Sequence, residues 1–297
     1  MATARPSWLP VDLYPFNGRY ADIDGNRVHY VDEGSGPPIV MLHGNPFWSF
    51  TYRDIIRRLR GRFRCIAIDY PGFGRSLARD GYDFKPASHA KVVGELVERL
   101  GLNRWTLFGN DWGGPIGLSV AQRDPKRVRA VILGNTWAWP PTGPEDAGLR
   151  RFSKLLGGAI LGAFLVHRLN VFLNVFTARG PGGKRTPAEM AAYRAPFPTA
   201  ASREPVHVFP REILDSAAWL AEIEAALPRL AAKPALLLWG DMDPAFGARH
   251  LKRFEDALPR HRTRWLRGAG HDIQDDAPDA ISDEILAWWD AEVSGLG

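Results

Sequence analysis

The chain has 297 residues, of which 45% are hydrophobic and 24% are charged, and these fractions are ordinary for a globular protein and exclude a disordered one. This length predicts one large domain, or one domain that carries an insertion. The net charge of +5 comes mostly from arginines scattered among acidic residues, so it does not indicate a nucleic-acid partner.

Three further features concern location and the redox state of the chain. Residues 1–6 lack the apolar segment of a secretory signal, so we expect a cytoplasmic protein. The single cysteine, Cys65, has apolar neighbours and is predicted to be a buried structural thiol. The apolar run Leu155–Val166 is too short to span a membrane. We expect this run to form a helix packed on an apolar pocket, and an oligomer interface, with self-association of the chain, is the alternative.

The first part of the chain alternates short strands with turns and helices. Residues 19–23 and 27–31 flank a turn signal and predict a hairpin. The apolar runs 38–42 and 65–68 are typical of buried parallel strands, and residues 55–59 have helical spacing. Ser88 is predicted to cap a helix that ends near Gly101.

The same alternation continues toward the other end of the chain, with an interruption. It predicts strands at 105–108, 129–133, 234–239 and 263–266, and helices at 112–122 and about 279–289. Such a pattern favours a mostly parallel sheet flanked by helices. Residues 136–212 show helical patterns and no convincing strand. We therefore predict an α/β core formed by residues 1–135 and 213–297, with a helical cap at 136–212 inserted after the sixth strand and lying over the carboxyl ends of the strands.

The strongest motif is Gly109-Asn110-Asp111-Trp112-Gly113-Gly114, which follows a predicted strand and opens a predicted helix. This is the setting of the nucleophile elbow of α/β-hydrolases, where a sharp turn lifts the central side chain above the sheet. Glycines on both sides let the strained turn pass close to its neighbours. The central residue here is an aspartate, so Asp111 is the predicted nucleophile. The alternative is a helix cap that happens to have glycine neighbours.

A base and an acid follow in the chain order expected for this fold. His271 comes after the last predicted strand and offers the general base. Asp241 and Asp243 follow the preceding strand, and we favour Asp243 as the acid because of its Gly-x-x-Asp spacing. The loop His43-Gly44-Asn45-Pro46 follows the strand 38–42, where such loops supply one backbone N–H of an oxyanion hole. We assign the two oxyanion N–H groups to Asn45 and Trp112.

At this point the sequence resembles the haloalkane dehalogenases over nearly its whole length. The motifs that carry the resemblance are His43-Gly44-Asn45-Pro46, Asp69-Tyr70-Pro71-Gly72-Phe73-Gly74-Arg75-Ser76, the Asn-Asp-Trp-Gly-Gly elbow, Tyr193-Arg194-Ala195-Pro196-Phe197-Pro198 and His271-x-Ile273-Gln274-Asp275-Asp276. The resemblance implies an α/β-hydrolase fold and halide binding by the side chains of Asn45 and Trp112. Some members carry the triad acid as a glutamate at the position of Asn135, which cannot serve here. The chain combines the halide-binding pair Asn45 and Trp112 with an acid, Asp243, that comes after the cap. In this it resembles the subgroup called type III, whose members tend to be weakly active and to self-associate.

These residue types suit the removal of halide from a small apolar halogenated substrate. A carboxylate at Asp111 is ionised near neutral pH, so it can attack an sp³ carbon and form an alkyl ester without a base. His271, oriented by Asp243, would then activate water to open the ester. The expected cosubstrate is water, the products are an alcohol and a halide ion, and no metal or organic cofactor is expected.

Three alternatives differ from this hypothesis in what they require. An epoxide hydrolase also uses an aspartate but typically takes two tyrosines from the insertion, and residues 136–212 contain only Tyr193. A serine esterase would need a serine in the elbow. A non-catalytic ligand-binding hydrolase fold is expected to have lost the nucleophile, the acid or the base. Candidate pocket residues are Phe47, Trp48, Trp137, Trp139, Phe164, Val171, Phe172, Phe197 and Leu214.

Overall fold

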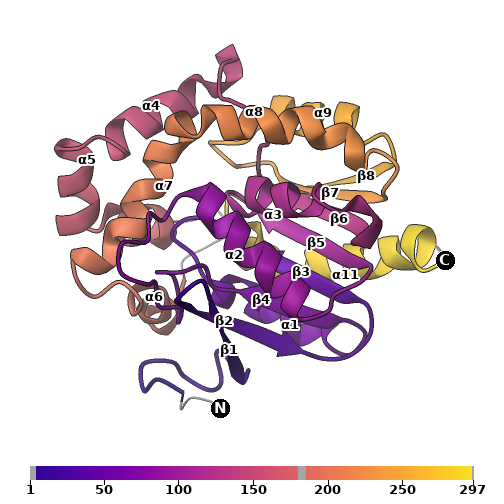
Figure 1. Cartoon of the computed structure of the whole chain (residues 1–297), viewed down its shortest axis with the longest axis horizontal. Coiled ribbons are helices and arrows are strands. Elements are labelled where there is room, and N and C mark those ends of the chain that lie inside the picture. Colours follow the sequence, from indigo (N-terminus) through magenta and orange to yellow (C-terminus); the bar gives the residue numbers. More distant parts are fainter. Residues whose placement is uncertain (1–4, 180–184, 296–297) are drawn as a thin grey trace.

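The computed structural model describes residues 5–179 and 185–295 of the chain. Its centre is an eight-stranded sheet with the order β1-β2-β4-β3-β5-β6-β7-β8. The pairs β1–β2 and β2–β4 are antiparallel, and the pairs from β4–β3 to β7–β8 are parallel (Figure 1). The strands are β1 (Gly18–Ile23), β2 (Asn26–Glu33), β3 (Pro38–Leu42), β4 (Arg64–Ile68), β5 (Trp105–Asn110), β6 (Val128–Gly134), β7 (Ala235–Gly240) and β8 (His261–Leu266).

The strands follow the apolar runs of the sequence because the central ones are covered on both faces. Every residue of β5 and of β7 is buried, which explains why both strands are mostly apolar. The predicted hairpin forms between β1 and β2, and Asp24 and Gly25 turn it with positive φ angles of 46° and 75°. Cys65 is a buried free thiol in β4, as predicted. The predicted mostly parallel sheet is therefore confirmed.

Helices cover both faces of the sheet. On one face α2 packs on α3 and α3 packs on α8, and on the other face α1 packs on α11 (Figure 1). The α-helices are α1 (Arg53–Leu59), α2 (Pro86–Arg99), α3 (Gly113–Ala121), α4 (Ala147–Leu156), α5 (Leu161–Ala163), α6 (Pro187–Arg194), α7 (Glu204–Asp215), α8 (Ala217–Ala226), α9 (Ala248–Ala257), α10 (Ile273–Asp276) and α11 (Pro278–Trp288). The described residues also contain three π-helical segments, which are η4 (Phe164–Arg168), η5 (Phe172–Phe176) and η9 (Trp289–Val293).

The region between β6 and β7 is helical, as expected for a cap inserted after the sixth strand. The described residues between 136 and 212 contain helices and no strand, and α7 continues past position 212 to Asp215. Figure 1 shows α4, α5, α6 and α7 grouped together at one side of the sheet. No helix in the described ranges is long and apolar enough to cross a membrane.

Two local predictions are wrong. The helix α2 begins at Pro86 with Lys85 as its cap residue, so Ser88 lies inside the first turn. Proline is favoured at the first helical position because its missing N–H has no partner there.

The run Leu155–Val166 does not form one helix packed on an apolar pocket. The helix α4 ends at Leu156, and a Cβ atom at Gly157 would lie 2.6 Å from the Arg211 backbone, so only glycine allows this close approach to α7. Beyond this break Ile160, Leu161 and Phe164 are more than half exposed.

Candidate active site

The predicted nucleophile, Asp111, lies in a sharp turn between β5 and α3. Its φ angle of 49° is unusual for a residue other than glycine, and such strain is held only where the surrounding structure fixes it. The Asp111 N–H donates to Asn135 O at 3.1 Å, and Thr136 Oγ1 donates to Asp111 O at 2.6 Å. A Cβ atom at Gly113 would lie 1.9 Å from Leu42 O, so the tight approach of this turn to β3 requires glycine. The sequence thus folds into the elbow that its motif predicts.

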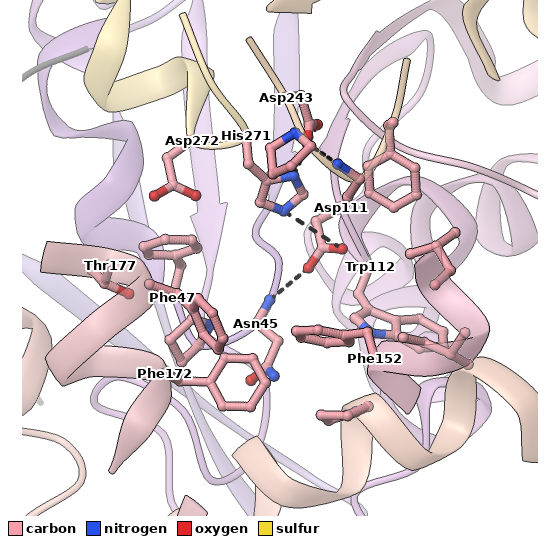
Figure 2. Close-up of a pocket in the computed structure, with 18 of the residues that line it drawn as sticks. Asn45, Phe47, Asp111, Trp112, Phe152, Phe172, Thr177, Asp243, His271 and Asp272 are labelled. Atoms are coloured by element: carbon pink, nitrogen blue, oxygen red, sulfur yellow. Dashed lines mark hydrogen bonds and ion pairs between the residues drawn. The ribbon is translucent and has the colours of Figure 1, made fainter. Parts of the chain in front are cut away.

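Two backbone N–H groups face the Asp111 carboxylate. The Asn45 N–H donates to Asp111 Oδ2 at 2.9 Å, and the Trp112 N–H also lowers the pKa of this carboxyl by hydrogen bonding (Figure 2). The loop that carries Asn45 is fixed by His43, whose Nδ1 donates to Gly44 O at 2.8 Å and whose Nε2 accepts from the Tyr70 N–H at 3.3 Å. Burial lowers the pKa of His43 to about 4, so this imidazole is neutral at physiological pH.

The predicted base and acid meet on the opposite side of Asp111. His271 Nε2 lies 3.8 Å from Asp111 Oδ1, and His271 Nδ1 lies 3.0 Å from Asp243 Oδ2. In Figure 2 the imidazole stands between the two carboxylates. The side chain of Asp243 is fully buried. Asp241, by contrast, is exposed and accepts a hydrogen bond from the Gly268 N–H at 2.7 Å. The Asp243 carboxylate can therefore orient the His271 imidazole and accept a hydrogen bond from its Nδ1 proton.

The charges of these groups shift one another's pKa values. Burial lowers the pKa of His271, but the carboxylates of Asp243, Asp111 and Asp272 raise it to about 10. Burial raises the pKa of Asp243, and the adjacent imidazolium with its hydrogen bonds brings it below the usual range. Burial raises the pKa of Asp111 above its usual value, although His271 and the two N–H groups oppose this rise. The resting site therefore favours an imidazolium between carboxylates.

Asn135 contributes to this site in a way that the sequence motifs do not indicate. Asn135 follows β6 with a φ angle of 36°, and its Nδ2 donates to Asp243 Oδ2 at 2.6 Å. Its Oδ1 accepts from the Gly240 N–H at 2.7 Å. The sequence showed only that this side chain cannot be the acid. Asparagine adopts positive φ more often than most residues do. An asparagine directly after a strand therefore indicates a tight turn that can hold its side-chain amide in one place.

The side chains of Asn45 and Trp112, which the resemblance assigns to halide binding, border the same space. Asn45 Nδ2 donates to Val206 O at 3.1 Å, which anchors the amide to the cap and leaves its second N–H for the cavity. The Trp112 indole packs on Trp137 and Phe209, with ring centroids 4.7 and 5.2 Å apart. Both groups can donate hydrogen bonds and carry no charge, which suits a weakly hydrated anion.

A cavity of about 510 Å³ opens over Asp111, between the core and the cap. In Figure 2 Phe47, Phe152 and Phe172 surround the space into which the Asp111 carboxylate points. Of the predicted pocket residues Phe47, Trp137 and Phe172 line it, whereas the other six do not. The further apolar lining residues are Pro46, Leu149, Val175, Phe176, Pro210, Ile213, Pro244, Ala245, Phe246 and Phe152. Phe164, for example, points outward and is 53% exposed.

A buried group of charges lies beside His271 and joins the cap to the core. Arg185, at the start of the segment that leads into α6, contacts Asp272 at 2.7 Å and Asp275 at 2.9 Å. Arg53 of α1 contacts Asp275 and the α6 residue Glu189, both at 2.6 Å. No local spacing pairs these residues, because they come from three segments that are far apart in the chain.

The structure also brings together three ligand-type side chains that the sequence spacing did not reveal. His167, Glu204 and His207 form the one such group in the described part of the chain, and it lies in the cap. None of these three residues lines the cavity over Asp111.

Known proteins resemble this chain in both sequence and structure. Residues 37–278 match the family described as alpha/beta hydrolase fold. "Haloalkane dehalogenase 2" of Mycobacterium tuberculosis is 44% identical over 276 residues, which cover 92% of this chain and 95% of the relative. "Cis-3-alkyl-4-alkyloxetan-2-one decarboxylase" of Shewanella oneidensis is 33% identical, with 92% and 88% covered.

Crystal structures of haloalkane dehalogenases superpose well on this chain. DatA from Agrobacterium tumefaciens gives a TM-score of 0.83 at 28% identity, with 92% of this chain and 95% of DatA covered. DbeA from Bradyrhizobium elkanii gives a TM-score of 0.83 at 27% identity, with 92% and 97% covered. The fold and the comparisons define an α/β-hydrolase. Within that class the chain belongs to the haloalkane dehalogenase family.

Proposed function

We propose that the protein hydrolyses haloalkanes to an alcohol and a halide ion through an ester on Asp111. The observation that carries this proposal is the Asp111 carboxylate at the elbow, which faces an apolar cavity with His271 on one side and the Asn45 N–H on the other. The family to which the chain belongs supports the same reaction class.

In the first step an oxygen of the Asp111 carboxylate attacks the carbon that carries the halogen. The C–O bond forms as the carbon–halogen bond breaks, and both bonding electrons leave with the halide. The Trp112 indole N–H and the Asn45 amide stabilise the growing negative charge. Hydrogen bonds to charged groups contribute about 1.5–3 kcal/mol each, so each donor accelerates the step by roughly 10- to 100-fold if it acts mainly in the transition state.

In the second step water opens the ester. His271 takes a proton from the water, the hydroxyl adds to the ester carbonyl, and the N–H groups of Asn45 and Trp112 hold the oxyanion. Conversion of Asp111 to a neutral ester removes one of the charges that raise the pKa of His271. The alkylated enzyme is therefore the state in which the imidazole loses its proton more readily and serves as a base. Collapse of the intermediate releases the alcohol and frees Asp111.

The geometry favours this reaction over the alternatives. An acid for epoxide opening would have to face the cavity, but Tyr193 is fully buried and donates to Asp275 Oδ2 at 2.5 Å. No tyrosine lines the cavity among the residues that the structure describes. A protein that only binds a ligand does not require a histidine oriented by a buried aspartate, as His271 is by Asp243 at 3.0 Å.

We propose water as the cosubstrate, no cofactor, and a small apolar haloalkane as the substrate. The apolar lining fits such a molecule and leaves few groups that could recognise polar substituents. A cytoplasmic location stays a prediction.

We further propose that the chain self-associates through its cap. Exposed large apolar side chains are concentrated there, in α4, α5, η4, η5 and their connections. These residues are Leu155, Ile160, Leu161, Phe164, Leu169, Val175 and Phe176. Patches of this kind mark interaction surfaces. Sedimentation velocity of the full chain and of a Phe164→Glu variant tests this, and a monomer at all concentrations for both would contradict it.

A second candidate reaction is decarboxylation of an oxetan-2-one. A relative with this name is 33% identical over 92% of the chain. The ring carbon of such a lactone that carries oxygen is also an sp³ centre with a leaving group, so Asp111 can attack it in the same apolar cavity. Loss of carbon dioxide then returns the Asp111 carboxylate and leaves an alkene, without net uptake of water.

The first experiment measures halide and proton release from a panel of small bromoalkanes, with the Asp111→Ala variant as control. Release that depends on Asp111 supports the dehalogenase, and no release by folded protein contradicts it. Gas chromatography of the same protein with a cis-dialkyl oxetan-2-one then tests the second candidate. An alkene that the wild-type chain forms and the variant does not would support it.

A further inference from the structure

Three side chains in the cap form a cluster separate from the catalytic cavity. His167 belongs to η4, and Glu204 and His207 belong to α7, which packs against η4. Each offers one nitrogen or oxygen atom, and these atoms all lie within 4.8 Å of one another. Glu204 and His207 are three positions apart, so they share one face of α7. His167 approaches them from η4, which packs against α7.

Hydrogen bonds to backbone carbonyls orient both imidazoles. His167 Nδ1 lies 3.0 Å from Ala200 O, and because a carbonyl only accepts, Nδ1 must carry the proton. His167 Nε2 faces Glu204 Oε2, 3.3 Å away, on the side of the ring opposite to this carbonyl. His207 Nε2 lies 3.3 Å from Gly158 O, which leaves the Nδ1 lone pair unused. Metal-binding histidines are held in this way, with the second ring nitrogen donating to a carbonyl.

We propose that His167, Glu204 and His207 bind a Zn²⁺ ion. Two imidazoles and one carboxylate suit Zn²⁺ and related transition metals, whereas Ca²⁺ and Mg²⁺ prefer oxygen ligands throughout. His207 is buried and His167 half-buried, while Glu204 is exposed at 43%, so the site is formed in the fold and open to solution. Three protein ligands leave one position of a tetrahedral ion for water or an anion. Arg168 and Arg211 border the same depression and favour an anion in that position.

The bound ion would cross-link two segments of the cap. Beyond His207, α7 supplies Phe209, which packs on Trp112, and Pro210 and Ile213, which line the catalytic cavity. The Val206 carbonyl on the same helix anchors Asn45. An ion that binds only the folded protein raises the stability of the fold. Zn²⁺ at this site therefore stabilises α7 and the wall of the cavity that α7 forms.

The test is calorimetric titration of the full chain, without a polyhistidine tag, with ZnCl₂ near neutral pH. We expect one ion per chain, a rise in Tm with Zn²⁺, and at least tenfold weaker binding by His167→Ala and by Glu204→Gln. The matched control is His261→Ala, which alters a half-buried histidine that faces Glu255 at 4.0 Å and belongs to no three-ligand group in the described part of the chain. It should bind as the wild type does.

Absorption spectroscopy gives a second measurement of metal binding that is independent of calorimetry. Co²⁺ in place of Zn²⁺ should give the visible absorption of a four-coordinate ion, and His167→Ala should abolish it. The His167 side chain is 19% exposed, and circular dichroism checks that this variant folds. Absence of binding at millimolar Zn²⁺, or binding that both cluster variants retain in full, would overturn the proposal.

Discussion

Asn135 Nδ2 donates to Asp243 Oδ2 at 2.6 Å, and the same oxygen accepts from His271 Nδ1 at 3.0 Å. Asn135 follows β6 and Asp243 follows β7, so two neighbouring strand ends fix the acid of the proposed triad. The Asn135 Oδ1 atom accepts from the Gly240 N–H at 2.7 Å, so the amide has one orientation. Asp243 Oδ1 accepts from the Ala245 N–H at 2.7 Å, which fixes the carboxylate from its other side.

Replacement of Asn135 by alanine should slow ester hydrolysis more than ester formation. The variant loses a donor to a fully buried carboxylate, and the His271 ring loses part of its support. We expect steady-state turnover to fall by roughly tenfold, since about 1.4 kcal/mol corresponds to that factor, while a burst of bromide is retained. Rapid-quench measurement of bromide release tests this, and equal loss of burst and steady state would contradict a positioning role.

Replacement of His271 by phenylalanine should trap the alkyl ester. Attack by Asp111 needs no base, whereas hydrolysis does. Mass spectrometry after incubation with a bromoalkane should show one added alkyl group per chain, located by proteolysis on Asp111. The double variant that also carries Asp111→Asn should show none. Rapid turnover by His271→Phe without an adduct would rule out His271 as the base.

Replacement of Trp112 by phenylalanine keeps an aromatic ring against Trp137 and Phe209 but removes the indole N–H. We expect the rate of ester formation to fall by roughly 10- to 100-fold, which is the effect of one hydrogen bond to a charged group. Trp137→Phe is the matched control because Trp137 lines the same cavity, and its effect should be several-fold smaller. Pre-steady-state bromide release measures both, and equal effects would argue against a specific halide donor at Trp112.

The raised pKa of His271 predicts a pH-dependent part of the stability. Its pKa in the folded protein is about 10, above the ordinary 6.5 of an unfolded chain. The stabilisation is fully present below pH 6.5 and is lost as the pH rises toward 10, because the folded state holds a proton that the unfolded state has released. Urea unfolding at a series of pH values should show this fall, and His271→Gln should lack it. Parallel curves for the two proteins would contradict the prediction.

Replacement of Arg185 by alanine should lower the free energy of unfolding by weakening the junction between the cap and the core. Its loss leaves the buried carboxylates of Asp272 and Asp275 without one of their cations, and breaking a buried pair in this way costs about 3–5 kcal/mol. The control is Arg99→Ala, which removes an exposed pair with Glu95 and should change the free energy of unfolding by at most about 1 kcal/mol. Denaturant unfolding compares them, and equal losses would refute a structural role for the buried charges.

Much of the core could be predicted from the sequence because its signals are local. Short, mostly apolar runs mark β3, β5 and β7, and the glycines around Asp111 mark the elbow. The residues at the ends of these strands then meet because the carboxyl ends of parallel strands lie on one edge of the sheet. Asp111, Asp243 and His271 come together by this rule alone.

The cap was harder to predict, since its details depend on contacts between distant segments. The helix α4 ends at Leu156, where Gly157 packs against the backbone of Arg211 in another helix, and Ile160 and Phe164 beyond this end are exposed. Phe152 of α4 lines the cavity, whereas Phe164 beyond the end of that helix does not. The pairing of Arg185 with Asp272 likewise joins residues 87 positions apart.

The groups proposed to react all lie on loops of the core, whereas the cap contributes apolar walls and the Val206 carbonyl that anchors Asn45. The shape of the cavity and the chemistry within it are thus encoded in separate parts of the chain. Substitutions at Phe152, Phe172 or Phe176 can change which molecules fit without moving Asp111 or His271. Such a division lets new substrates be acquired through the cap while the reaction itself is inherited unchanged.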